Sequence, residues 1–265
     1  MGKGLTVFTI AVLVCASLAS SQPTDSRSSY DVPLSLQPRY MVDFPTAGLP
    51  PKGGFYVDAD IYGEGGVLLY LGVGFARYFS FGISYGGLRI IGSGDPEMNP
   101  RPAVQLKARI IEESFVIPAI ALGFDSQGRG GYLDSLDRYL LKSRGIYAVA
   151  SKNWDLLGPF SAHGGISYSL EDDDNNGATI FLGAIKTFGN FLDLRGEYDF
   201  AISDDWTDNP NISDDGILNM SAIWHVNTSF SIGIEVRDVL TGNKVHLDDL
   251  REWNRGLCIE YRGIL

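Results

Sequence analysis

The chain has 265 residues and an acidic balance, with 32 Asp and Glu against 21 Lys and Arg and a formal net charge of −11 at pH 7. This charge argues against nucleic acid as a partner and against peripheral docking on anionic lipid. Beyond the first residues there is no run of 18 or more apolar residues, so a chain built from membrane-spanning helices is excluded.

The N-terminus has the features of an export signal. A lysine near the start is followed by an apolar stretch from Leu5 to Leu13, and small residues at Ala19–Ser21 offer a cleavage site. We therefore expect residues 1–21 to be a signal peptide. Cys15 would leave with it, so Cys258 would remain without an intramolecular disulfide partner.

Residues 22–54 form a polar and then proline-rich segment with no sustained period. Its prolines are Pro33, Pro38, Pro45, Pro50 and Pro51. Such a composition favours turns over regular elements. We predict a periplasmic lead-in segment that packs in part against the mouth of the following domain.

Residues 55–265 contain about twelve segments in which apolar and polar residues alternate. Most run about 8 to 12 residues, which suits a tilted membrane strand and exceeds the roughly 5 to 6 residues usual in globular sheets. The predicted strands are Phe55–Tyr62, Gly66–Ala76, Phe79–Ile90, Pro102–Ile111, Phe115–Phe124, Gly145–Lys152, Phe160–Leu170, Thr179–Thr187, Phe191–Ile202, Ile217–Val226, Phe230–Leu240 and Gly256–Ile264.

The connections between these strands alternate in length. Tight ones are Arg77–Tyr78, Glu112–Ser114, Phe188–Asn190 and Asn227–Thr228, and most of the intervening ones are long and polar. Short turns inside and long loops outside are typical of bacterial outer-membrane barrels. We predict an all-β fold: a transmembrane antiparallel up-and-down β-barrel of about 12 strands (10–14). It would lie in the outer membrane of a Gram-negative-type bacterium, in contact with lipid and lipopolysaccharide.

Two segments depart from this simple pattern. Pro118 lies inside the predicted strand Phe115–Phe124, where proline cannot donate a ladder hydrogen bond, so we expect a local bulge there. Tyr132–Ser143, in the longest loop, has leucines at helical spacing, which predicts a short helix. That helix would constrict the pore or lie at its rim; the alternative for the same residues is a loop packed on itself.

The predicted inward faces carry charges of both signs. The lumen-facing polar candidates are Asp58, Asp60, Lys107, Arg109, Lys152, His163, Asp193, Arg195, Glu197, Asp199, Glu235 and Arg237. One interpretation is a wet lumen that conducts or binds a hydrophilic solute. The other is a salt-bridged, filled interior, because barrels near 8 strands are filled and those of 16 to 18 hold a channel.

The sequence gives little sign of catalysis or of a cofactor. His163 and Ser161 share an inward face, but no sequence feature pairs them as base and nucleophile. No phosphate loop, zinc spacing or nucleophile elbow occurs. A weak metal candidate is the first half of a calcium loop at Asp172, Asp174 and Asn176, but Gly183 stands where the bidentate glutamate is expected.

Several stretches resemble bacterial outer-membrane barrels of the YjbH type, which are associated with exopolysaccharide production. They are Gly92–Pro96, Asn99–Pro102, Pro118–Gly128, Ser151–Asn153 and Glu197–Asp199. The resemblance implies an outer-membrane location and a connection to polysaccharide. It implies no catalytic residue.

The function favoured by these observations is a non-enzymatic porin-like or export-accessory barrel for a hydrophilic solute such as a polysaccharide. One alternative is a lipid- or glycan-modifying barrel enzyme, which a clefted Ser–His pair would favour. Another is a structural or adhesive barrel acting through its acidic outer loops, which a filled lumen would favour.

Overall fold

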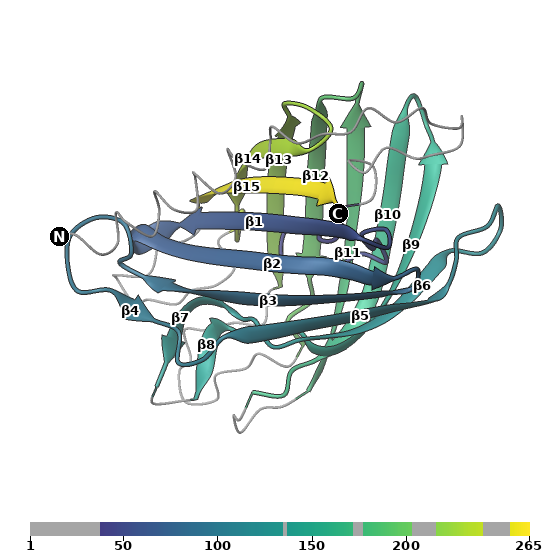
Figure 1. The fold of residues 1–265 in the computed structure, drawn as a ribbon. Helices are drawn as coiled ribbons and strands as arrows, with labels where there is room; N and C mark the ends of the chain where they lie inside the picture. Colours follow the sequence, from purple (N-terminus) through teal and green to yellow (C-terminus); the bar gives the residue numbers. More distant parts are fainter. Residues whose placement is uncertain (1–37, 135–136, 172–176, 203–215, 241–254) are drawn as a thin grey trace.

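The computed structural model describes residues 38–134, 137–171, 177–202, 216–240 and 255–265, so the predicted signal peptide lies outside the described residues. Its wall is built of antiparallel strands (Figure 1). The wall strands are β1 (Gly54–Tyr62), β2 (Gly66–Ala76), β3 (Phe79–Leu88), β5 (Ala103–Ile111), β6 (Ala119–Asp125), β9 (Gly145–Asp155), β10 (Pro159–Tyr168), β11 (Ala178–Phe188), β12 (Leu192–Asp199), β13 (Ile217–His225), β14 (Phe230–Val236) and β15 (Arg255–Ile264).

These twelve strands close into an up-and-down barrel. Each pairs with its neighbours along the chain, and β1 pairs with β15 from Gly54 opposite Ile264 to Ile61 opposite Leu257. The predicted fold class is confirmed. Closure matters physically because backbone N–H and C=O groups within a bilayer must be satisfied by the protein itself.

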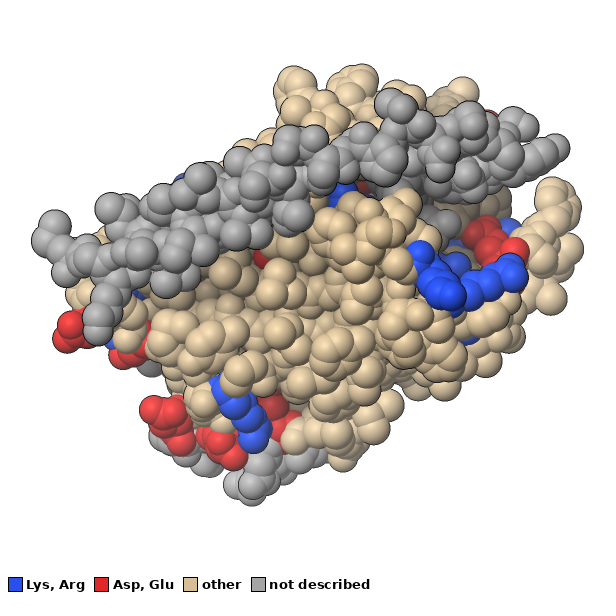
Figure 2. Space-filling model, in the orientation of Figure 1, with Lys and Arg blue, Asp and Glu red and all other residues tan. Residues whose placement is uncertain are grey.

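Alternation along each strand separates the two faces of the wall. In β12, Asp193 and Glu197 are buried on the inner face, whereas Leu194 between them is 44% exposed on the outer face. In the view of Figure 2 the middle of the outer surface is largely uncharged, and the visible charged side chains gather toward the ends. An apolar belt of this kind faces lipid, and the protein is an outer-membrane barrel.

The two ends of the barrel differ. The connections β2–β3, β5–β6, β9–β10, β11–β12 and β13–β14 are short, and both chain ends of the wall lie with them. There the Gly53 N–H donates to the Gly74 carbonyl over 2.7 Å, and the Leu265 N–H donates to the Gly53 carbonyl over 2.9 Å. By the usual orientation this is the periplasmic end. Within the described residues, no helix is both long and apolar enough to cross a membrane.

Strand β6 begins later than predicted. It starts at Ala119, so Pro118 lies outside it, and the register shift of this strand pair lies on the partner strand β5, between Arg109 and Ile111. The residues before it form a tight turn, in which the Ser114 N–H donates to the Ile117 carbonyl over 2.9 Å and the Ser114 hydroxyl accepts from the Ile117 N–H over 3.0 Å. Proline lacks an N–H and is therefore better placed here than in a closed ladder.

The predicted helix at Tyr132–Ser143 is wrong. This region holds a hairpin of β7 (Arg129–Leu133) and β8 (Arg138–Leu141), separate from the wall sheet. The two-residue strand β4 (Glu97–Met98) pairs with the end of β3. Tyr132 and Tyr139 face each other across the hairpin with ring centroids 5.0 Å apart. Positive φ at Asp137, inside the predicted range, is incompatible with a continuous helix, so the leucine spacing misled the prediction.

Candidate functional site: a plugged lumen

The lumen holds a loop of the chain that precedes β1. Residues 39–49, here called the plug segment, turn back on themselves with Tyr40 paired to Pro45 and the Thr46 N–H donating to the Arg39 carbonyl over 2.9 Å. Every residue from 41 to 47 is buried. The described part of the predicted lead-in, residues 22–54, therefore lies largely inside the barrel.

An apolar cluster seats the plug segment against one side of the wall. The Phe44 ring stacks on the Phe181 ring of β11 with centroids 4.3 Å apart, and the Arg144 guanidinium lies 3.7 Å from the Phe44 centroid. Gly183 on the same strand has no side chain, and a Cβ there would collide with the Met41 sulfur. The full cluster is Met41, Phe44, Ala47, Ala119, Ala121, Tyr147, Val149, Phe181 and Ile185.

Glu197 of β12 holds the tip of the plug segment through its backbone. Its carboxylate oxygens accept hydrogen bonds from the N–H groups of Val42, Asp43 and Phe44 over 2.9–3.0 Å, and from the Asn219 side chain over 2.8 Å. Three successive N–H groups around one carboxylate form an anion nest. A buried carboxylate with four donors is satisfied, so this contact fixes the position of the plug segment in the lumen.

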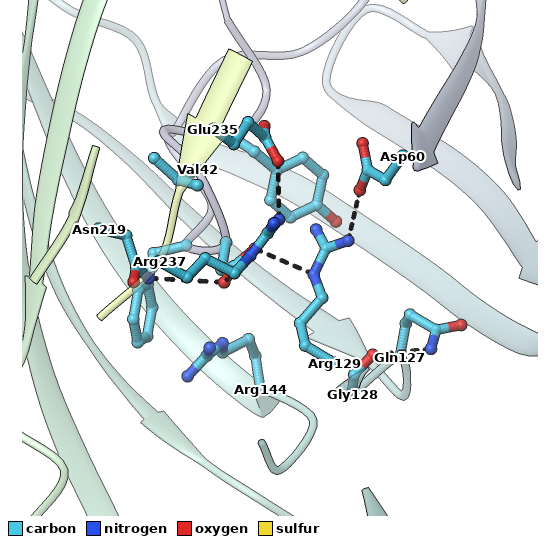
Figure 3. Close-up of polar contacts among 12 residues, drawn as sticks. Val42, Asp60, Gln127, Gly128, Arg129, Arg144, Asn219, Glu235 and Arg237 are labelled. Atoms are coloured by element: carbon cyan, nitrogen blue, oxygen red, sulfur yellow. Dashed lines mark hydrogen bonds and ion pairs between the residues drawn. The ribbon is translucent and has the colours of Figure 1, made fainter. Parts of the chain in front are cut away.

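Asp43, at the plug tip, lies in a cage of arginines. Arg237 donates to its two carboxylate oxygens over 2.9–3.1 Å, and Arg129 Nε lies 3.1 Å from Oδ1 (Figure 3). Burial alone would raise the pKa of Asp43, but the guanidiniums of Arg237 and Arg129 outweigh it and hold the pKa well below the ordinary value. Asp43 is therefore a stable carboxylate.

The cage arginines are also held by carboxylates of the wall. Arg129 pairs with Asp60 of β1 over 2.5 Å, and Arg237 pairs with Glu235 of β14 over 2.8 Å (Figure 3). Arg129 belongs to the β7–β8 hairpin from the long-loop end. The ion pair between Arg129 and Asp43 thus joins the β7–β8 hairpin, which comes from the long-loop end, to the plug segment, which comes from the periplasmic end.

Lys107 and Arg109 of β5 bind the backbone of the plug segment. The Lys107 ammonium donates to the carbonyls of Arg39, Thr46 and Gly48 over 3.0–3.3 Å, and Arg109 Nε donates to the Ala47 carbonyl over 3.0 Å. Positive groups on this strand therefore hold carbonyl oxygens of the plug.

The remaining predicted lumen residues belong to other polar clusters. Asp58 pairs with Arg39 of the plug segment. Asp193 contacts Thr187 over 2.7 Å and His225 over 3.0 Å, and Arg195 pairs with Glu260 over 3.1 Å. Asp199 pairs with Arg144 over 3.2 Å, and Lys152 pairs with Glu113 in the periplasmic turn over 2.9 Å. Apart from Asp58, these contacts join wall strands to one another or to loops.

A cavity of about 450 Å³ lies at the periplasmic end, between the plug segment and the wall strands β6 and β9–β12. Ser161 and His163 line it. The Ser161 hydroxyl lies 2.9 Å from His163 Nε2, and the Ser151 hydroxyl lies 2.7 Å from His163 Nδ1. The sequence did not reveal this Ser–His contact. The imidazole meets a hydroxyl, and not a carboxylate, on its second nitrogen, so the cluster lacks the orienting acid of a serine triad.

Sequence reasoning missed the residues that fill the lumen, namely Arg39, Asp43, Phe44, Arg129 and Arg144. A signal was present in β11, where both faces are apolar: Phe181 and Ile185 face inward, while Ile180 and Leu182 face lipid. An apolar inner face requires a covering partner, and the Met-Val-Asp-Phe stretch at residues 41–44 supplies it.

The calcium candidate Asp172, Asp174 and Asn176 lies outside the described residues. Among the residues that the structure describes, no group of three or more His, Cys, Asp or Glu side chains is arranged to hold a metal ion.

No protein-family model matches the chain, and no curated protein sequence matches it. Among solved structures, the NanC porin is similar with a TM-score of 0.46 and 10% sequence identity, over 80% of this chain and 99% of that one. The outer-membrane protein Omp33 of Acinetobacter baumannii is similar with a TM-score of 0.42 and 7% identity, over 82% of this chain and 100% of that one.

Proposed function

We propose that this protein is a gated, porin-like conduit for a hydrophilic solute, closed at rest by the plug segment. The observation that carries the proposal is that the middle of a charged lumen is filled by a loop that contributes no strand to the wall. Such a loop can leave without breaking any ladder hydrogen bond of the barrel.

Opening has a free-energy cost that side-chain burial sets. Withdrawing the plug segment exposes Met41 and Phe44, both almost fully buried, at about 1.5–3 kcal/mol each. The polar contacts of Glu197 and Asp43 add to this unless water or solute replaces them. An unaided open state would therefore be populated at about 1% or less. A solute must favour the open state to raise that fraction.

The experiment is a planar-bilayer recording of refolded protein. One variant has residues 39–49 replaced by a Gly-Ser linker of equal length, so the connection to β1 is kept. We expect the wild type to be closed with brief openings, and the linker variant to show a steady conductance.

Strand content by circular dichroism establishes that the linker variant has folded. A folded linker variant that conducts no more than the wild type would contradict the proposal. A wild type that is already as open as the variant would contradict it equally.

A second candidate function is hydrolysis of an ester, favoured by the contact between Ser161 and His163 beside the cavity. If it operates, refolded protein should hydrolyse p-nitrophenyl butyrate and react with a fluorophosphonate probe, and Ser161→Ala should abolish both. Ser151→Ala is the matched control, because it removes the other hydroxyl on the same imidazole. Equal activity in wild type and Ser161→Ala would eliminate this candidate.

We also propose that the hydrophilic solute is a polysaccharide, as the resemblance to YjbH-type barrels implies. Trp154 and Phe160 border the cavity, together with the charged groups Arg109 and Asp193. Aromatic faces beside charged groups suit a sugar ring. Quenching of Trp154 fluorescence by an oligosaccharide, and its absence in Trp154→Leu, would test this.

A further inference from the structure

The position of the Asp43 carboxylate is surrounded by hydrogen-bond donors that do not belong to the plug segment. Arg237 follows β14 and donates from Nε and Nη2, and Arg129 in the hairpin forms an ion pair with Asp43 through Nε over 3.1 Å. The Asn219 amide of β13 lies 3.5 Å from Oδ2. The Asp43 side chain has no exposed surface. A buried carboxylate therefore fills a site built by the wall and the hairpin.

The two arginines are anchored by contacts that do not involve the plug segment. Arg237 is held by Glu235, and Arg129 is held by Asp60 (Figure 3). Withdrawal of Asp43 would leave guanidinium N–H groups that water or another acceptor must satisfy. A carboxylate satisfies them better than water, because hydrogen bonds between ionised groups are the stronger ones.

We propose that the Asp43 position is a carboxylate-binding site of the conduit, filled by the plug in the closed state and by an acidic solute in the open state. This inference rests on the proposed function and names the class of solute. The plug carboxylate and the solute carboxylate compete for one set of donors. An acidic solute thus favours the open state, and a neutral one does not.

The donor geometry argues for a carboxylate over other ligands. Arg237 presents two donors to the two oxygens of one group, which is the fork arrangement that matches a carboxylate. Net charge does not select the anion, because two arginines face two wall carboxylates once Asp43 has gone. Selection comes from the guanidinium N–H groups that have lost their acceptor. A neutral hydroxyl compound satisfies these groups less strongly than a carboxylate does, so it binds less tightly.

The test uses sodium D-glucuronate as the acidic probe and D-glucose as the neutral one, in bilayer recordings. Asp43→Ala removes the plug carboxylate from the site, and we expect it to open the conduit because the two arginines lose their partner in the closed state. We expect glucuronate to block its current in a saturable manner and glucose to have no such effect. Adding Arg237→Gln to Asp43→Ala should raise the half-blocking concentration at least tenfold.

Adding Lys152→Gln in place of Arg237→Gln is the matched control, because it also removes one positive charge that pairs with a carboxylate, that of Glu113, and Lys152 makes no contact with Asp43 in the interactions of the described residues. This control should change the half-blocking concentration less than twofold. Glu197→Gln loosens the plug by a different route and keeps Asp43 as competitor. Its half-blocking concentration for glucuronate should therefore exceed that of Asp43→Ala.

Failure of the carboxylate-binding site and failure of the conduit give different experimental results. If Asp43→Ala conducts and glucuronate blocks it no better than glucose, the carboxylate site is wrong and the conduit stands. The same conclusion holds if Arg237→Gln and Lys152→Gln change the half-blocking concentration alike. If Asp43→Ala, Glu197→Gln and the linker variant all fold and none conducts, the proposed function itself is wrong.

Discussion

At the scale of single residues, the plug segment is held by two different kinds of contact. Phe44 lies between the Phe181 ring and the Arg144 guanidinium, and Asp43 lies among arginine donors one residue earlier. Burial of Phe44 stabilises the seated plug segment. The Asp43 contact fixes where the plug sits, because a buried charged group without its partner is strongly disfavoured. Substitutions can therefore separate the two.

Phe44→Ala should release the plug segment without unfolding the wall. Loss of a fully buried phenylalanine removes about 3–5 kcal/mol from the seated state, which corresponds to a rise in open fraction of roughly a hundredfold or more. Bilayer recordings measure this. Phe81→Ala, on the lipid face of β3, is the control and should leave the open fraction unchanged. An open fraction in Phe44→Ala equal to that of the wild type would show that the ring does not hold the plug.

The contribution of Asp43 to closure depends on pH. Because its pKa in the folded protein lies below the ordinary value of 3.8, this contribution is complete above that value and is lost as the pH falls further. We expect the difference in open fraction between the wild type and Asp43→Asn to stay constant from neutral pH to about pH 4 and to shrink in stronger acid. Bilayer recordings of both proteins measure this difference. A difference that shrinks between neutral pH and about pH 5 would contradict the assignment.

Leu194→Arg tests which side of the wall faces lipid. Leu194 is 44% exposed on the outer face of β12, so an arginine there should lower the free energy of unfolding in vesicles by about 2–4 kcal/mol if it lies near the bilayer midplane. Leu194→Met should change it by much less, because it keeps an apolar chain at the same place. Equal folding free energies for the two variants would mean that this face does not meet lipid.

At the scale of elements, the sequence predicted the wall and failed on what fills it. Alternation marks a strand wherever one face meets lipid and the other meets polar groups, and all twelve predicted wall strands are present. The plug segment has no period, because its conformation is set by contacts with Glu197, Lys107 and Phe181, far away in the sequence. The β7–β8 hairpin was mistaken for a helix because leucine spacing was weighed above its glycines.

The same limit applied to the candidate site. Charged residues such as Asp60 and Arg237 could be placed on inner faces by parity alone. Their partners Asp43 and Arg129 could not, because they lie in irregular or hairpin segments whose position only the closed barrel defines. Parity gives the face that a strand residue occupies, but it does not give the partner across the lumen.

The orientation of the elements predicts accessibility to a membrane-impermeant thiol reagent. Asp134→Cys, in the hairpin turn at the long-loop end, should react on intact cells, and Thr228→Cys, in the β13–β14 turn, should react only after the envelope is opened. Cys258 is buried and should give little background. Reaction of Thr228→Cys alone on intact cells would invert the barrel, and equal reaction of both would argue against insertion.

At the scale of the whole molecule, the lumen is closed by two parts that meet. The plug segment comes from the periplasmic end and the β7–β8 hairpin from the long-loop end, and Asp43 joins Arg129 where they touch. Below the plug a cavity of about 450 Å³ opens toward the periplasmic turns. In this arrangement the plug segment and the hairpin block the lumen with charged groups at the centre, and the cavity lies on the periplasmic side of the block.

The most direct test of this account locks the plug segment to the wall. The Ala47 N–H lies 2.8 Å from the Ser151 hydroxyl, so the plug segment contacts the wall directly at this pair, and a disulfide engineered here would hold the two together. Ala47→Cys with Ser151→Cys is made in an Asp43→Asn, Cys258→Ala background, and single-channel conductance is recorded before and after reduction. The account predicts a closed barrel when the disulfide is formed, a conducting one after reduction, and closure again on reoxidation. Equal conductance in the oxidised and reduced protein, with the disulfide verified by mass spectrometry, would contradict it.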